Sequence, residues 1–252
     1  MVVGCTAAPA AEIVLVFVGP TDSSAYKGAR QGLEEAQAQG EFLGQHYTLT
    51  VQATSSPHPL QATAIIAATN EAGLYQLVTV NPGIAILNAE LKDNKLRRTC
   101  RANLLHVLPS AEMEASALAQ WRAANPQAKD VVARAWHPAF EKYAGIELNK
   151  RYQQAFNQPM DDTAWAAWAA VKLVSDMVAR EQNADGTALL TALRDRLAFD
   201  GQKGVDLSFR RDGQLRQPIL LVSGNKVVGE APLHGAGESA GLDSLGRVGC
   251  EK

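Results

Sequence analysis

The 252-residue sequence has only three cysteines, Cys5, Cys100 and Cys250, and none belongs to a CxxC pair. This spacing excludes the usual zinc and thioredoxin-like sites. The sequence also lacks any run of about 18 apolar residues, so no segment is expected to span a membrane. A formal net charge of -2 provides no basic field to attract phosphate backbones, which argues against nucleic acid as a partner.

Catalytic signatures are missing as well. The sequence contains no GxSxG elbow, no GxxxxGK[ST] loop, no GxGxxG after a strand and no HExxH. His137 and Glu141 are four residues apart, but two side chains are too few to hold a metal ion. We therefore expect a protein that is not an enzyme and has no metal site and no intrinsic cofactor. A flavodoxin-like enzyme with an unrecognised motif is the weaker alternative.

What the sequence does contain is an alternation of strand-like and helix-like segments. Residues 12–18 form a continuous β-branched and apolar run, which is typical of a strand buried on both faces. Ser23 and Ser24 precede a helical pattern that runs to Gln39 and ends at Gly40. Further strands are expected at 47–53, 74–80, 100–107 and 130–136, and further helices at 60–71, after 81–83, and at 111–123, 138–157, 162–181 and 187–197. This alternation predicts an α/β fold with an open, mainly parallel sheet and helices on both faces.

The two ends of the chain differ in composition from the middle. Residues 2–5 resemble the end of a bacterial lipoprotein signal, in which Cys5 carries the lipid and residues 1–11 form a tether; the alternative is a cysteine in a disordered leader. Residues 232–252 are rich in Gly, Ser and Ala and are expected to form an extended arm. Export would place Cys100 and Cys250 in an oxidising compartment, where they could form a disulfide.

A candidate binding site follows from the ends of the predicted strands. In an open parallel sheet, ligands bind outside the carboxyl ends of the strands, where helix N-termini offer free N–H groups. The side chains expected in these loops are Thr21, Ser23, Ser24, Ser55, Asn81 and Ser110. Their hydroxyl and amide groups suit a small anionic or polar solute. The alternative is that each of them only caps a helix or forms a turn.

Aromatic and cationic residues add two further candidates. Trp136 and Trp165 are expected to contribute to an aromatic surface that binds a ligand or a second subunit, although core packing is the default for tryptophan. A run of four cations could steer an anion, although a solvated strand edge is the commoner case. These cations are Lys95, Arg97, Arg98 and Arg101.

Three stretches of the chain resemble the type I periplasmic binding proteins of the leucine/isoleucine/valine-binding class. They are the first helix and turn (28–44), the tryptophan- and alanine-rich run 165–171, and the closing hairpin 199–218. The amino-acid sequences of residues 42–45, 103–110 and 215–221 are similar to one branch of this class, the binding proteins associated with PQQ-dependent alcohol oxidation. A polar connector at 123–129 stands where this class places a second α/β lobe of about 100 residues.

The resemblance implies a periplasmic solute-binding protein of an ABC transport system that is not an enzyme. Its domain would be a single lobe over residues 12–231, built from segments 12–123 and 130–231, with the second lobe reduced or absent. PQQ is one ligand that the resemblance implies, and an ABC permease or a PQQ-dependent dehydrogenase system is the implied partner. The alternative is an interaction module that has lost solute binding. It would form a homodimer through the face that lines the cleft between the two lobes in this class, which we call the old cleft face.

Overall fold

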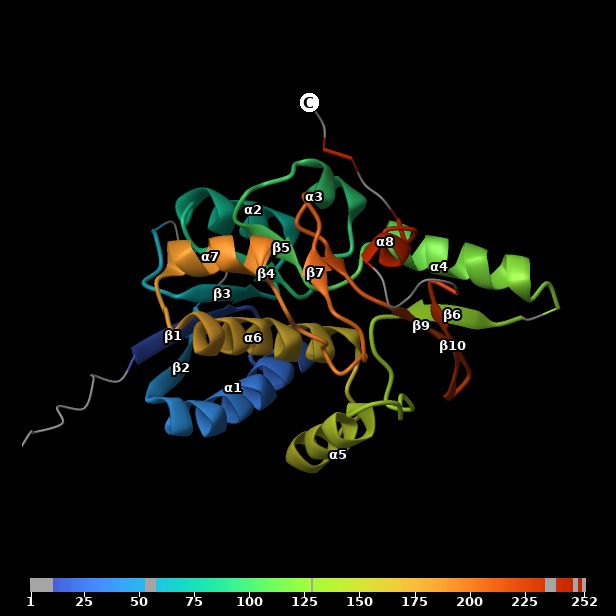
Figure 1. The fold of residues 1–252 in the computed structure, drawn as a ribbon, viewed down its shortest axis with the longest axis horizontal. Helices are drawn as coiled ribbons and strands as arrows, with labels where there is room; N and C mark the ends of the chain where they lie inside the picture. Colours follow the sequence, from blue (N-terminus) through green and yellow to red (C-terminus); the bar gives the residue numbers. More distant parts are fainter. Residues whose placement is uncertain (1–10, 53–57, 128, 234–238, 247–248, 251–252) are drawn as a thin grey trace, which may run out of the picture.

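A five-stranded parallel sheet organises the fold, as Figure 1 shows. The computed structural model describes residues 11–52, 58–127, 129–233, 239–246 and 249–250, so Cys5 and Ser55 lie outside the described residues. The strands are β1 (Ala11–Val18), β2 (Gln45–Gln52), β3 (Ala64–Ala67), β4 (Ala85–Asn88) and β5 (Leu104–His106). They lie in the order β2-β1-β3-β4-β5 and all pair in parallel; we call them the main sheet. The predicted α/β fold class is confirmed.

Helices cover both faces of the main sheet. The first face carries α1 (Ser24–Leu43), α6 (Asp162–Glu181) and α7 (Gly186–Asp195), with α5 (Gly145–Phe156) packed outside them on α1; the second carries α2 (Glu71–Val80) and α3 (Asn94–Arg98). Because side chains alternate along a strand, Leu15 and Phe17 of β1 pack toward the first face, and Val16 and Val18 toward the second. Within the described part of the chain, no helix is long and apolar enough to cross a membrane.

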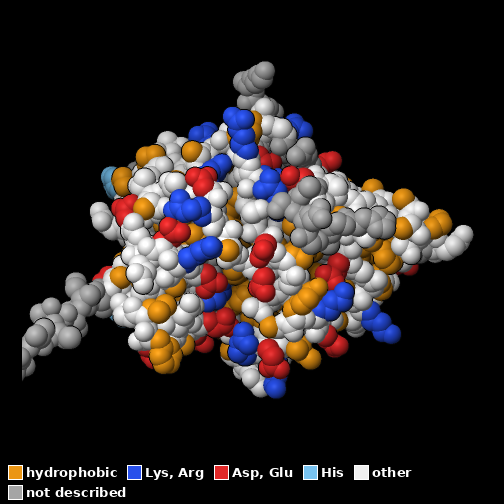
Figure 2. Space-filling view, in the orientation of Figure 1, with side chains coloured by type: hydrophobic (Ala, Val, Ile, Leu, Met, Phe, Trp, Pro, Cys, Tyr) orange, Lys and Arg blue, Asp and Glu red, His pale blue; other side chains and the backbone are white. Residues whose placement is uncertain are grey.

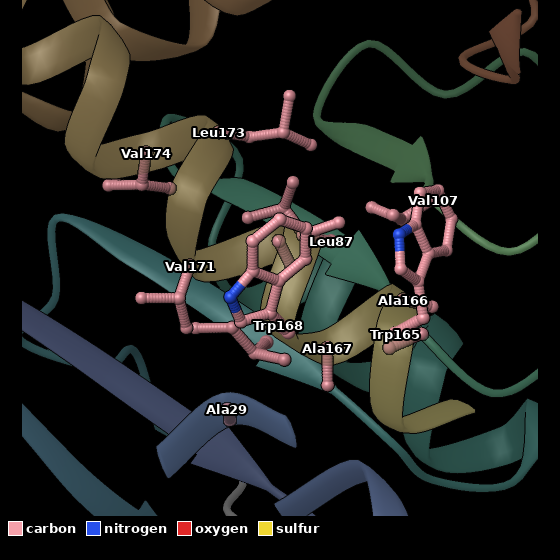
Figure 3. Packing of buried hydrophobic residues seen from close by; sticks show 14 of the residues in the cluster. Ala29, Leu87, Val107, Trp165, Ala166, Ala167, Trp168, Val171, Leu173 and Val174 are labelled. Carbon is pink, nitrogen blue, oxygen red and sulfur yellow. The ribbon is translucent and has the colours of Figure 1, made fainter. Parts of the chain in front are cut away.

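Helices α1 and α6 pack unusually close together because α1 presents small residues. A Cβ atom at Gly28 would lie 1.9 Å from the carbonyl oxygen of Ala164. Figure 3 shows α6 side chains such as Trp168 and Val171 close to Ala29 of α1. Glycine at position 28 is therefore required by the space between the helices.

A second, smaller structure stands beside the main sheet. It consists of α4 (Ala111–Ala124), β6 (Val131–Arg134), β9 (Ile219–Ser223) and β10 (Lys226–Ala231), as Figure 1 shows. These strands form an antiparallel sheet in the order β10-β9-β6, which we call the small sheet. Met113 and Ala117 of α4 pack on Ala133 and Leu221 of this sheet.

The hairpin β7 (Ser208–Phe209) and β8 (Leu215–Arg216) lies at the free edge of the main sheet. The backbone N–H of His106, at the end of β5, donates to the carbonyl oxygen of Gly213 at 2.7 Å. This places the hairpin between β5 and the small sheet, where β9 follows it directly in sequence.

The predicted elements between residues 60 and 90 are wrong in kind. Strand β3 lies inside the expected helix 60–71, the expected strand 74–80 is helix α2, and β4 stands where a helix was expected. Asn70 caps α2 by accepting from the N–H of Gly73 at 2.9 Å. Leu74 and Leu77 then pack on the second face of the main sheet, so packing overrides the strand preference of this β-branched run.

The ends of two predicted segments also differ. Helix α1 continues past Gly40 to Leu43 and ends at Gly44, whose φ of 65° suits glycine. Ala11, expected in the leader, begins β1. The described part of the C-terminal segment is not an extended arm: residues 239–242 form the short helix α8, and Leu242 and Leu245 are buried.

Candidate functional site

Four of the predicted polar residues lie at the carboxyl edge of the main sheet. Thr21 is exposed in the loop after β1. Ser23 caps α1 by accepting from the N–H of Tyr26 at 3.1 Å, and Ser24 is the first residue of that helix. Ser110 is buried and caps α4 by accepting from the N–H of Met113 at 3.1 Å. The hydroxyls of Ser23 and Ser110 are therefore already used in helix capping.

Asn81 does not lie at this edge, because the segment before it is a helix and not a strand. It follows α2, which returns the chain to the opposite end of the sheet. Its buried side chain donates to the carbonyl oxygen of Leu77 at 2.9 Å and accepts from the N–H of Leu60 at 2.7 Å. The prediction of Asn81 as a binding residue is wrong for this reason.

A pocket of about 520 Å³ opens between the main sheet and the small sheet. Glu90, Lys92 and Leu108 line it from the loops after β4 and β5, and Trp136 and its neighbours from the segment after β6. The turn before α6 closes the third side. The lining residues are Glu90, Lys92, Leu108, Arg134, Trp136, His137, Pro138, Pro159, Met160, Asp161, Asp162 and Thr163. The pocket therefore lies where ligands of parallel sheets bind.

Trp136 forms a fixed wall of this pocket. Its indole is 1% exposed, stacks on Trp165 with 5.9 Å between ring centroids, and donates to Oδ1 of Asn149 at 2.7 Å. Trp165 is fully buried behind it and donates to the carbonyl oxygen of Gly201 at 3.1 Å. The ammonium of Lys203 lies 4.0 Å from the Trp165 ring. Trp136 thus lines the pocket, whereas Trp165 supports it from the core.

Asp162 is the centre of an ion-pair network beside Trp136. Its carboxylate lies 3.3 Å from Nζ of Lys92 and 3.5 Å from Arg134, and accepts from the backbone N–H of Trp136 at 2.9 Å. Lys92 also pairs with Glu114 of α4. Burial lowers the pKa of Lys92, but Glu114 and Asp162 outweigh it and raise the pKa overall. Both cations of the pocket are therefore already partnered by carboxylates.

Two other carboxylates of the lining are not paired in this way. Among the described residues, neither Glu90 nor Asp161 has a cation within ion-pair distance. Partial burial, and then the charge of Asp161, raise the pKa of Glu90. Burial, and then the charge of Arg134, lower the pKa of His137, which favours its neutral form. The lining thus holds three carboxylates against two cations.

The sequence did not indicate Glu90, Lys92, Asp161 or Asp162, although they supply most of the charge of the pocket. Glu90 and Lys92 follow β4, a strand that the sequence pattern assigned to a helix. Asp161 caps α6 by accepting from the N–H of Ala164 at 2.8 Å. The sequence signal that could have indicated Asp161 and Asp162 is their position as an acidic pair at the start of a helix rich in small and apolar residues.

The remaining predicted candidates have structural roles. Arg97 is fully buried and donates to backbone carbonyls and Gln214, Lys95 pairs with Glu71, and Arg101 lies over the Tyr75 ring. Figure 2 shows acidic and basic side chains interspersed over the visible face. Arg97 is therefore too buried to steer an anion, and Lys95, Arg97 and Arg98 lie in α3 and not at a strand edge. Nδ1 of His137 accepts from the N–H of Ala139 at 3.1 Å, and the described residues contain no cluster able to hold a metal.

Cys100 and Cys250 are joined by a disulfide bond, with 5.5 Å between their Cα atoms. The bond closes a chain separation of 150 residues and attaches the end of the chain to the segment between α3 and β5. It lies outside the pocket lining. Its contribution is therefore to the architecture that surrounds the pocket.

Comparison with known proteins gives similarity in structure only. No family model and no curated protein sequence matches the chain. An ABC transporter substrate-binding protein from Desulfitobacterium hafniense superposes with a TM-score of 0.69 at 12% identity, over 84% of this chain and 97% of that chain. A branched-chain amino acid ABC transporter periplasmic ligand-binding protein from Burkholderia xenovorans gives 0.70 at 10%, over 85% and 90%. An ABC-type branched-chain amino acid transporter from Rhodopseudomonas palustris gives 0.70 at 11%, over 96% and 100%.

These identities are too low to carry a ligand or an activity from one protein to another, but the agreement in fold is extensive. It includes a parallel five-stranded sheet flanked by helices. The chain has the fold of a type I periplasmic binding protein lobe.

Proposed function

We propose that this protein is a solute-binding protein of an ABC transport system and not an enzyme. The observation that carries the proposal is the pocket between the carboxyl edge of the main sheet and the small sheet, with Trp136 as its rigid wall. A concave site with one aromatic wall and a few convergent charges is the usual form of a small-molecule site. The names of the structural neighbours support the same class of function.

The charges of the lining favour a solute that carries an ammonium group. Lys92 and Arg134 are held by Asp162 and Glu114, so a polyanion would have to displace existing ion pairs. Glu90 and Asp161 have no ion-pair partner among the described residues and can face an amine, although Oδ1 of Asp161 already accepts from the N–H of Ala164. An amino acid or an amine is therefore a better match than PQQ, a polycarboxylate that the sequence resemblance gave as one ligand.

We also propose that α4 and the small sheet are what this chain has in place of a full second lobe. Between α4 and the small sheet lies a small core that includes Met113, Ala117 and Leu221, and the other face of the small sheet packs into the main core. Periplasmic location, an ABC permease as partner, a link to a PQQ-dependent dehydrogenase system and lipidation at Cys5 belong to the same proposal. The resemblance of the sequence supports them, and Cys5 lies outside the described residues.

The alternative, a homodimer that uses the old cleft face, has less support. It needs Trp136 and Trp165 to be available to a second subunit, but they are 1% and 0% exposed within the single chain. Their indole N–H groups are also satisfied internally, by Asn149 and by the Gly201 carbonyl. We therefore keep solute binding as the proposed function.

A melting experiment with four probes tests this proposal. Leucine carries both charged groups, isopentylamine only the ammonium and 4-methylpentanoate only the carboxylate; PQQ is the fourth probe. A ligand that binds only the folded state raises the melting temperature, by several degrees at about 100 times its Kd. We expect leucine and isopentylamine to raise it. A rise with PQQ or the carboxylate alone would contradict the charge argument, and no rise with any amine or amino acid would contradict the function.

A further inference from the structure

The molecule consists of two parts, and the pocket lies between them. One face of the small sheet forms a core with α4, whereas Leu220 and Val222 on its other face join the core of the main sheet. The first part is the main sheet with its helices, and the second is α4 with the small sheet. The chain passes between them three times, after β5, after β6 and after β8. Lys92 and Leu108 of the first part line the pocket together with Arg134 of the second, and Trp136, which follows β6, packs in the core of the first part. The relative position of the two parts therefore sets the shape of the pocket.

The described residues of the C-terminal segment, 239–246 and 250, contact both parts; we call them the strap. On the small-sheet side, Leu245 is fully buried in the core of α4 and the small sheet. The N–H of Gly246 donates to Oγ of Ser116 at 3.1 Å, and Gln120 donates to Oγ of Ser244 at 3.1 Å. A Cβ at Gly246 would lie 2.4 Å from the backbone nitrogen of Met113, so the strap packs directly on α4.

On the main-sheet side, the strap is held by two arginines of the hairpin. Arg210 is buried and donates at 2.8 Å to the carbonyl oxygens of Leu242, Leu245 and Gly246. It also pairs at 2.8 Å with Asp243, which accepts a second charged hydrogen bond from Arg216 at 2.9 Å. Because the hairpin is hydrogen-bonded to β5, these contacts attach the strap to the main sheet.

The disulfide adds a covalent attachment on the same side. Cys250 is bonded to Cys100, which lies between α3 and β5 of the first part. The strap is thus attached to the first part by hydrogen bonds from the buried Arg210 and by the disulfide, and to the second part by its own buried Leu245. A buried guanidinium that loses its carbonyl and carboxylate partners is costly, so the attachment is strong.

We propose that the strap holds the two parts in one fixed arrangement, so that the pocket is permanently formed and is not closed by a hinge. Proteins with two lobes commonly close around a ligand by hinge motion. A strap bonded to both parts opposes that rotation. The statement about the pocket rests on the proposed function, whereas the statement about the strap concerns the protein without solute.

Amide hydrogen exchange of the solute-free protein tests the strap. In Arg210→Met the disulfide stays intact, but the strap loses its buried cation. We expect amides of α4, β9 and β10 to exchange on the order of tenfold faster relative to those of β1, β3 and β4, because the small part opens separately. Arg211→Met is the matched control, since Arg211 is an exposed neighbour in the same turn and should leave this ratio unchanged.

A second variant guards against misfolding of the first. Cys100→Ser with Cys250→Ser removes the covalent attachment and leaves Arg210 in place; it should change the same ratio in the same direction. Equally faster amide exchange in both parts would show that the strap only adds general stability. Unchanged exchange rates would show that the strap does not hold the two parts together. Either result overturns the proposal. Because no solute is present, these outcomes are independent of the melting experiment.

Discussion

The carboxylate of Asp162 accepts a hydrogen bond from the backbone N–H of Trp136 at 2.9 Å. Asp162 begins α6 on the main sheet, and Trp136 follows β6 of the small sheet. The same carboxylate lies within 3.5 Å of both Lys92 and Arg134. One carboxylate with a side chain only 9% exposed therefore joins the two walls of the pocket.

Asp162→Asn should lower the free energy of unfolding by about 1–3 kcal/mol. The substitution keeps the size of the side chain but removes the negative charge that pairs with Lys92 and Arg134. Urea unfolding followed by circular dichroism measures the loss. Asp206→Asn, an exposed site, serves as the control; an equal loss in the two variants would contradict the central position given to Asp162.

Gly28→Ala should destabilise the protein by roughly 2–4 kcal/mol, because the new Cβ would lie 1.9 Å from the Ala164 carbonyl oxygen. Relief requires α1 and α6 to move apart, and both helices carry core residues along their contact. Thermal and urea unfolding measure the change. Gly249→Ala is the matched control, since no atom lies within 4 Å of its Cβ. A stable Gly28→Ala variant would show that the close approach of the helices is not required.

The stability of the protein should depend on pH through Lys203. Burial lowers the pKa of Lys203 to about 7 from its usual 10.5. Between these values the unfolded chain binds a proton that the folded chain lacks, so this lysine makes the free energy of unfolding rise with pH. Below pH 7 both states are protonated, and the cost of burying the charge is fully present.

Lys203→Met removes this dependence. The wild-type free energy of unfolding minus that of the variant should increase from about pH 7 to pH 9.5, by up to about 1.4 kcal/mol per pH unit. Urea unfolding at four pH values measures the difference, with the exposed Lys226→Met as control. A difference that stays constant over this range would show that Lys203 keeps its proton in the folded state.

The sequence predicted the fold class because the strongest patterns lie in the strands and helices that build the main sheet. Residues 12–18 are uniformly apolar, as a strand buried on both faces requires, and they form β1. Helices α4 and α6 were also expected nearly within their observed bounds. These segments carry their own caps, Ser110 and Asp161, so local signals and packing agree.

The candidate site was predicted less well, because a site depends on which strand ends lie together. Val78 and Val80 favour a strand, and nothing local shows that Leu74 and Leu77 pack on the second face as a helix. Because of this error, Asn81 was predicted at the wrong edge of the sheet and β4 was not predicted. Glu90 and Lys92, which follow β4, were therefore not recognised as site residues. Trp136 was expected in an aromatic surface with Trp165, and it lines the pocket, but the stacking of Trp165 behind it is a tertiary contact that no local pattern indicates.

The central claim is that the pocket binds an ammonium-bearing solute, and calorimetric titration tests it most directly. Leucine and isopentylamine are titrated into the wild type, Glu90→Gln and the control Glu41→Gln, an exposed glutamate near the end of α1. We predict saturable one-to-one binding that Glu90→Gln weakens by about tenfold, roughly the loss of one charge-assisted contact, and that Glu41→Gln leaves unchanged. The absence of binding to the wild type, or equal affinities of wild type and Glu90→Gln, would contradict the claim.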